Sequence, residues 1–184
     1  TQVTISVVTY FIIRIFNKSE KSLYISASFA GISYILIYLL NFKVITILPT
    51  IHFMVTGLSL LFLFIAYNEI IILERKMRKI KNGDFLNAEL FPIEKNYKIV
   101  FKLLGIGLIF LSFALISGFS LQSVFTANIV FKAIFTFIAW IIYIFTMVGI
   151  KFFNFPIKYA TRSLFLAMWA VLAAYFMNSY ITGS

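Results

Sequence analysis

Long runs of apolar residues, separated by short polar segments, make up most of this chain. A helix needs roughly 20 residues to cross the hydrocarbon core of a bilayer, and about six runs approach that length. They cover residues 2–17, 23–41, 51–73, 98–120, 129–150 and 161–181. The runs are continuously apolar, without the alternation of lipid-facing strands, and a helix pairs its own backbone groups in lipid. The pattern therefore predicts an all-α, polytopic transmembrane helix bundle, formed as a single domain over residues 1–184.

The composition indicates that lipid is the solvent. Of the 184 residues, 62% are hydrophobic and 12% are charged, and the mean hydropathy is +1.00. Soluble domains are nearer half apolar and a quarter charged, and a domain this small leaves much of its surface wet. We therefore expect the lipid bilayer to be the first partner. The first run is short and the chain starts at Thr1, so we also expect the N-terminus to be truncated.

Basic residues concentrate in alternate connections between the runs. The segments that follow the first, third and fifth runs carry most of them: Lys18, Lys21, Arg75, Lys76, Arg78, Lys79, Lys81, Lys95, Lys151 and Lys158. Loops rich in lysine and arginine stay in the cytoplasm. We therefore expect cytoplasmic basic loops, the main one at 75–97, and termini that face the outer side of the membrane. This topology accounts for the net charge of +10 without nucleic acid as a partner.

His52, the one histidine of the sequence, lies at the start of the third run and therefore at the predicted outer surface. A neutral imidazole there can bind haem iron or another metal. The alternative is an interfacial histidine that only hydrogen-bonds to a neighbouring helix. Lys132 lies at about the same level, near the outer end of the fifth run. It can meet a carboxylate such as a haem propionate, or simply extend toward the headgroups. The sequence has no cysteine and only six carboxylates, so we predict no metal cluster.

Glu69 lies near the inner end of the third run, about 25 Å along the helix from His52. Lys102 occupies a similar depth in the fourth run. Because isolated charges at this depth are costly, we predict a structural ion pair between Glu69 and Lys102. A proton or ion relay is the alternative. It needs further polar residues in line, for which only Asn68 and Ser112 are candidates.

Several segments resemble a known membrane-protein family. The stretch "IHFMVTGLS" at 51–59 is followed by "LERKMRK" at 73–79, and a proline-led helix start follows at 90–119. This order is similar to that of the cytochrome c assembly (CcsA/ResC-like) membrane proteins. The nearest branch is that of the YpjD-type inner-membrane proteins, which share a stretch like "AWIIYI" at 139–144. The resemblance covers residues 48–182 and, more weakly, the two runs before them.

The resemblance implies haem handling at the outer membrane face. In this family a tryptophan-rich outer segment, flanked by two histidines, holds haem for delivery to apocytochrome c. Only His52 carries over, as the match to the first histidine. The outer segment "SLQSVFTANIVFK" has no tryptophan, and Ile150 stands where YpjD-type sequences have histidine. Family members have about eight helices, so the resemblance implies two further helices upstream.

Two functions follow from these observations. The first is a haem-related protein of the cytochrome c assembly family, with His52 as one axial ligand, Lys132 at a propionate and a partner that completes the coordination. The second is a non-catalytic accessory or structural subunit that packs against other membrane-protein subunits. A transporter fits less well, because such sites use broken helices and polar groups at the bilayer midplane. The sequence offers no nucleophile–base pair and no carboxylate dyad, so we expect no enzyme.

Overall fold

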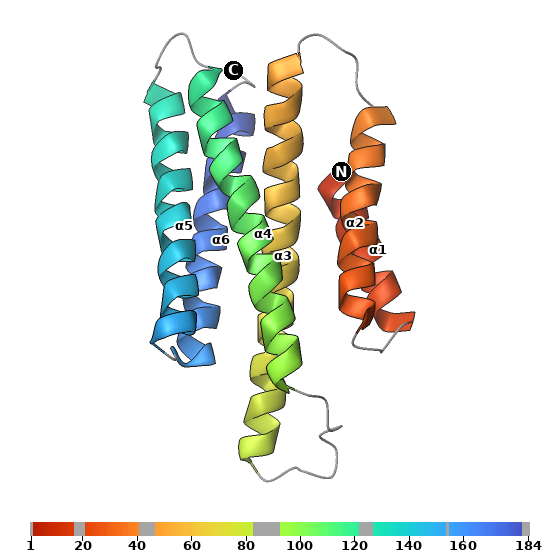
Figure 1. The fold of residues 1–184 in the computed structure, drawn as a ribbon. Coiled ribbons are helices and arrows are strands. Elements are labelled where there is room, and N and C mark those ends of the chain that lie inside the picture. Colours follow the sequence, from red (N-terminus) through yellow and green to blue (C-terminus); the bar gives the residue numbers. More distant parts are fainter. Residues whose placement is uncertain are drawn as a thin grey trace.

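The computed structural model describes residues 2–16, 21–40, 47–82, 93–121, 127–153 and 155–181. Its helices are α1 (Gln2–Phe16), α2 (Lys21–Leu40), α3 (Ile47–Lys81), α4 (Ile93–Ser120), α5 (Ala127–Phe152) and α6 (Ile157–Ile181). Consecutive helices run in opposite directions (Figure 1). The predicted all-α bundle is confirmed, and each predicted run corresponds to one helix.

Five of these helices are long and apolar enough to cross a membrane by length and composition. In α1 the apolar stretch is the shorter Val3–Ile15. The outward faces of the helices carry large apolar side chains, such as Ile15, Phe145 and Phe152, each at least two-thirds exposed. A soluble protein rarely exposes so large a contiguous apolar surface, whereas lipid solvates it. The protein is therefore a multi-pass membrane protein.

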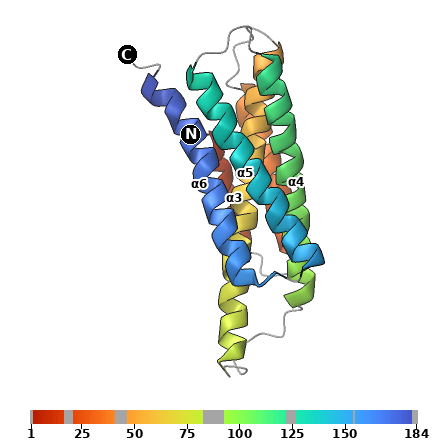
Figure 2. The ribbon, with the colours of Figure 1, turned by 90° about the vertical axis from the view of Figure 1, so that its left-hand side faces the viewer.

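The third helix is longer than its apolar run and continues through the basic segment to Lys81. Glutamate, lysine, arginine and methionine favour helix, and the Glu74–Arg78 pair, 3.1 Å apart, supports this turn. The last turn closes where the Asn82 N–H donates to the carbonyl groups of Arg78 and Lys79. The predicted loop at 75–97 is thus partly helical, since α3 ends at Lys81 and α4 begins at Ile93. The basic end of α3 extends past its neighbours (Figure 2).

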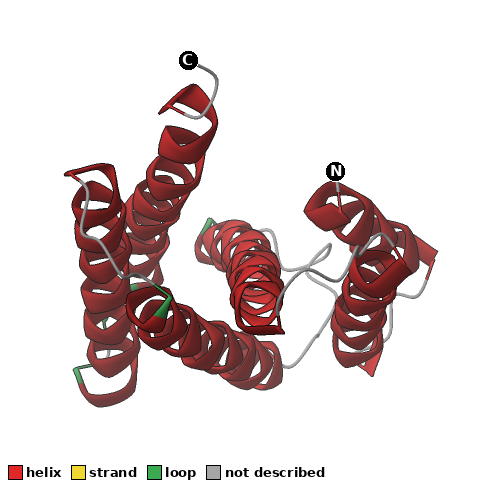
Figure 3. Ribbon diagram, turned by 90° about the horizontal axis from the view of Figure 1, so that it is seen from above, coloured by secondary structure: helices red, strands yellow, loops and turns green. Residues whose placement is uncertain are grey.

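The centre of the fold is α3. It packs against α1 and α2 on one side and against α4 and α6 on the other, while α5 packs against α4 and α6. Seen from above, the α1–α2 pair lies apart from the α4–α6 group, with α3 between them (Figure 3). Accordingly, the buried side chains of α3 occupy more than one face, since Leu61 and Leu63 are both buried although residues two positions apart lie on nearly opposite sides of a helix. Polar groups on α3 therefore meet partners from both sides.

Candidate functional site

His52 lies near the start of α3 and contacts the end of α4. Its Nδ1 is 2.8 Å from Ser117 Oγ. Ser117 Oγ also bonds to the Ala114 carbonyl at 3.2 Å. A hydroxyl has one hydrogen to donate, and the carbonyl can only accept it. When Ser117 gives this hydrogen to the Ala114 carbonyl, it accepts from His52, so this pattern of contacts favours a proton on Nδ1 and a lone pair on Nε2.

The imidazole of His52 fits closely against α4 because Gly118 has no side chain at the point of contact. A Cβ at Gly118 would lie 3.2 Å from His52 Cε1, which is tighter than ordinary van der Waals contact. Ala114, one turn before Gly118, is buried. The ring therefore packs against a face of α4 made of small residues, and the Ser117 hydroxyl fixes its orientation. Histidines that bind metals are commonly held in this way, with one ring nitrogen hydrogen-bonded to a partner and the other free to ligate.

Lys132 lies on α5, beyond its first turn, at the same end of the bundle as His52. Its side chain is half-buried, and its carbonyl accepts a hydrogen bond from Thr136 Oγ1 at 2.8 Å. The helix that carries it packs against α4 and α6, whereas His52 belongs to α3. The two predicted residues therefore share one end of the bundle but lie on helices that are not direct packing partners.

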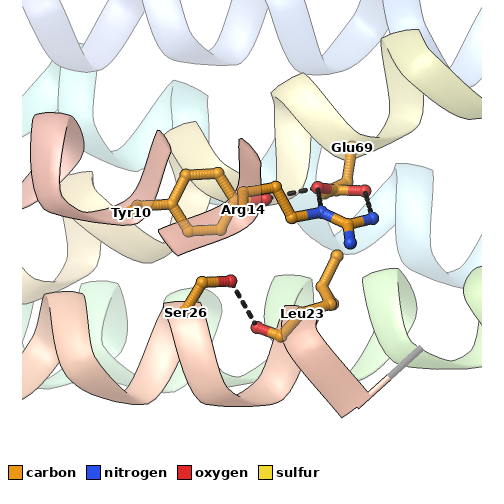
Figure 4. A network of polar contacts seen from close by, with 5 residues as sticks. All are labelled: Tyr10, Arg14, Leu23, Ser26 and Glu69. Carbon is orange, nitrogen blue, oxygen red and sulfur yellow. Dashed lines mark hydrogen bonds and ion pairs between the residues drawn. The ribbon is translucent and has the colours of Figure 1, made fainter. Parts of the chain in front are cut away.

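Glu69 is bound by side chains of α1. It is 5% exposed. Arg14 Nε lies 3.0 Å from Glu69 Oε1 and Arg14 Nη2 lies 3.5 Å from Oε2. The buried Tyr10 hydroxyl also donates to Oε1 (Figure 4). The carboxylate thus receives a guanidinium and a phenol from one face of α1, where Tyr10 and Arg14 are one turn apart.

The predicted ion pair between Glu69 and Lys102 is wrong, because Glu69 pairs with Arg14. Lys102 is exposed, on a face of α4 that also presents Ile106 and Ile109 outward. The opposite face, with Leu103 and Leu104, packs into the core. Although α3 and α4 pack against each other, the Lys102 side chain lies on the exposed face of α4 and not on the face that meets α3.

The two polar residues that a relay from Glu69 would need are engaged elsewhere. Asn68 Nδ2 donates to the Phe64 carbonyl at 2.8 Å within α3. Ser112 accepts from Trp140 Nε1 of α5, also at 2.8 Å. Neither bond leads toward Glu69. The cluster of Tyr10, Arg14 and Glu69 therefore fits a structural clamp between α1 and α3 better than a proton path.

Sequence reasoning missed Tyr10, Arg14 and Ser117. The spacing of Tyr10 and Arg14 places both on one face of α1, and this signal could have indicated a shared partner. Ser117 follows from the antiparallel packing of α3 and α4, which brings the start of α3 to the end of α4.

Within the described residues, no group of three or more His, Cys, Asp or Glu side chains could hold a metal ion. Comparison of the chain with protein-family models, with curated proteins and with solved structures found no match. The resemblance to the cytochrome c assembly proteins therefore stays a hypothesis that depends on the residues of this chain alone.

Proposed function

We propose that this protein handles haem at the membrane surface where α3 begins, with His52 as one axial ligand. The observation that carries the proposal is the hydrogen bond of 2.8 Å between His52 Nδ1 and Ser117 Oγ. It orients the ring, and with the proton on Nδ1 the Nε2 lone pair is available for iron. When bound, haem supplies an iron centre that accepts an imidazole at an axial position. Lys132, at the same end of the bundle, supplies a cation for a propionate.

This chain supplies one imidazole as an axial ligand. The sequence has one histidine and no cysteine, so the second imidazole of a bis-histidine site would have to come from outside residues 1–184, for example from a partner or a second copy of this chain. The role of this protein would then be to hold haem together with a partner. We propose a binding protein rather than an enzyme.

The proposed location is a bacterial inner membrane, with the basic ends of the helices in the cytoplasm. The distribution of cations supports this orientation. Lysines and arginines of the described residues gather where α3 ends and where α6 begins, while Lys132 lies at the opposite end. Since basic segments remain cytoplasmic, His52 and both ends of the chain would face the periplasm.

The test is the absorption spectrum of the protein purified in mild detergent and titrated with haem. We expect a Soret band that His52→Ala abolishes. Ser117→Ala should weaken haem binding by about 10-fold or more, because it removes the group that orients the ligand. Ser112→Ala is the matched control: it is the same change in the same helix, at a serine bonded to Trp140 instead. Equal haem binding by the wild type and His52→Ala would refute the proposal.

A second candidate is a non-catalytic accessory subunit that packs against other membrane proteins. It is favoured by the single histidine of the sequence, which cannot complete a bis-histidine site. A colourless protein that does not take up haem and co-purifies with a larger membrane complex would support this second function.

A further inference from the structure

A groove opens between α3 and α6 at the end of the bundle where the cations gather. Its volume is about 290 Å³. The residues that line it are Tyr67, Glu74 and Arg78 of α3 and Lys158, Thr161, Arg162 and Phe165 of α6. It lies at the opposite end of α3 from His52, and no role proposed above uses it.

The charge of this groove suits an anion. Three of its residues are cationic, and Glu74 offsets only Arg78, whose Nη2 is 3.1 Å from its carboxylate. Lys158 and Arg162 lie one turn apart, both exposed, in the first turns of α6. The N-terminus of a helix carries a partial positive charge, so cations there are disfavoured unless an anion joins them. A phosphate between Lys158 and Arg162 would supply that anion.

The groove becomes aromatic toward the middle of the bundle. Phe165 and Trp169 continue the stripe of Lys158 and Arg162 along one face of α6, at helical spacing. The Phe165 ring lies 6.1 Å from that of Tyr67 and 6.1 Å from that of Trp169. Both Phe165 and Trp169 are substantially exposed, at 43% and 59%. One face thus changes from two cations to two aromatic rings within about 16 Å.

We propose that this groove binds an anionic phospholipid of the surrounding bilayer. Its phosphate lies between Lys158 and Arg162, and an acyl chain runs along Phe165 and Trp169. Basic pockets between transmembrane helices on the cytoplasmic side are suited to such headgroups. The exposed aromatic rings favour a lipid over a soluble phosphate, because a free anion would gain nothing from them. The inference does not depend on haem binding.

Trp169 provides a local reporter for the test. The sequence has two tryptophans, so Trp140→Phe leaves Trp169 as the only one. This variant is placed in phosphatidylcholine vesicles that contain a small fraction of acyl-brominated phosphatidylglycerol or, for comparison, acyl-brominated phosphatidylcholine. Bromine quenches the fluorescence of an adjacent indole. We expect stronger quenching by the brominated phosphatidylglycerol at equal fraction.

Two double variants on this background separate a site from diffuse surface charge. Lys158→Gln with Arg162→Gln removes the two groove cations of α6. It should lower the preference for phosphatidylglycerol over phosphatidylcholine by about 5-fold for each cation. Lys79→Gln with Lys151→Gln removes the same charge from exposed residues at the same end that do not line the groove, and should preserve the preference. Equal losses in both double variants would overturn the proposal.

Two further measurements complete the test. Inorganic phosphate in the buffer should leave the quenching unchanged; displacement of the lipid by millimolar phosphate would assign the groove to a soluble anion and overturn the lipid assignment. The thermal unfolding temperature of the protein with both tryptophans intact should rise more with phosphatidylglycerol than with phosphatidylcholine. The site is supported if this difference in unfolding temperature is lost in the Lys158→Gln, Arg162→Gln variant and is kept in the Lys79→Gln, Lys151→Gln variant.

Discussion

Arg14 of α1 and Glu69 of α3 form an ion pair with 3.0 Å between Nε and Oε1, and the Glu69 carboxylate is almost fully buried. This pair joins the α1–α2 hairpin to the rest of the bundle. Helices α1 and α2 pack on each other and on α3, and further polar contacts join them to α3. Two of these are the bonds from the Tyr34 and Tyr38 hydroxyls to carbonyl groups of α3, at 3.4 and 3.1 Å.

The first prediction concerns this pair. Arg14→Met should lower the free energy of unfolding by about 3 kcal/mol, since it leaves the buried Glu69 without its counter-charge. Glu69→Gln should cost less, because the Arg14 side chain is 23% exposed. The double variant should cost less than the sum, with a coupling of about 2 kcal/mol. Unfolding in detergent, followed by circular dichroism, measures all three.

Two controls accompany this cycle. Glu74→Gln is the same substitution in the same helix, but its partner Arg78 is 68% exposed, so the loss should stay below about 1 kcal/mol. Lys102→Met should be additive with Glu69→Gln, because Lys102 faces outward. A coupling with Lys102 as large as that with Arg14 would contradict the observed pairing.

Tyr10 gives the second prediction. Its hydroxyl donates to the carboxylate that Arg14 neutralises. Tyr10→Phe keeps the ring in the core and removes only this donor, so the loss should be about 1–2 kcal/mol, smaller than that of Arg14→Met. The same unfolding measurement applies. A loss equal to that of Arg14→Met would mean that the phenol, and not the guanidinium, dominates the cluster.

The sequence predicted the helices well because membrane-spanning helices are determined by the length and hydropathy of apolar runs. Both quantities are obtained directly from one sequence. It predicted that the third and fourth runs are packed neighbours, as α3 and α4 are. It did not predict which way each side chain points. In a soluble helix, polar residues mark the outer face, but in this chain the lipid-facing residues Ile106 and Ile109 are as apolar as the buried Leu103 and Leu104. The apolar pattern therefore does not indicate which face of α4 packs against α3. For that reason the sequence did not show that Lys102 faces away from Glu69.

The contact between α3 and α4 gives a third prediction. A Cβ at Gly107 would lie 2.7 Å from Leu63 Cδ2 and 3.3 Å from the Leu63 backbone nitrogen. The Gly107 carbonyl also accepts from Ser59 Oγ at 3.2 Å. Gly107→Ala should therefore separate the helices and lower the free energy of unfolding by about 1–3 kcal/mol.

Gly105→Ala is the matched control for that change. A Cβ at Gly105 would meet only Met147 Cε, at 3.7 Å, which is an ordinary contact. Alanine is also the better helix former, so this variant should be neutral or slightly more stable than the wild type. Equal destabilisation by the two substitutions would indicate that helix geometry, rather than close packing at Leu63, decides the outcome.

The last prediction tests the proton position on His52 without any ligand. Because the sequence has one histidine, protein labelled with ¹⁵N-histidine gives a single pair of imidazole nitrogen signals. At a pH where the ring is neutral, the Ser117 hydroxyl should hold the proton on Nδ1, since it donates its own hydrogen to the Ala114 carbonyl. Ser117→Ala removes the acceptor and should shift the population toward Nε2–H, while Ser112→Ala should not. Gly118→Ala should have an intermediate effect, because its Cβ would press on His52 Cε1 and lengthen the bond to Ser117. A wild-type spectrum with the proton on Nε2 would remove the lone pair that the proposed haem ligand requires.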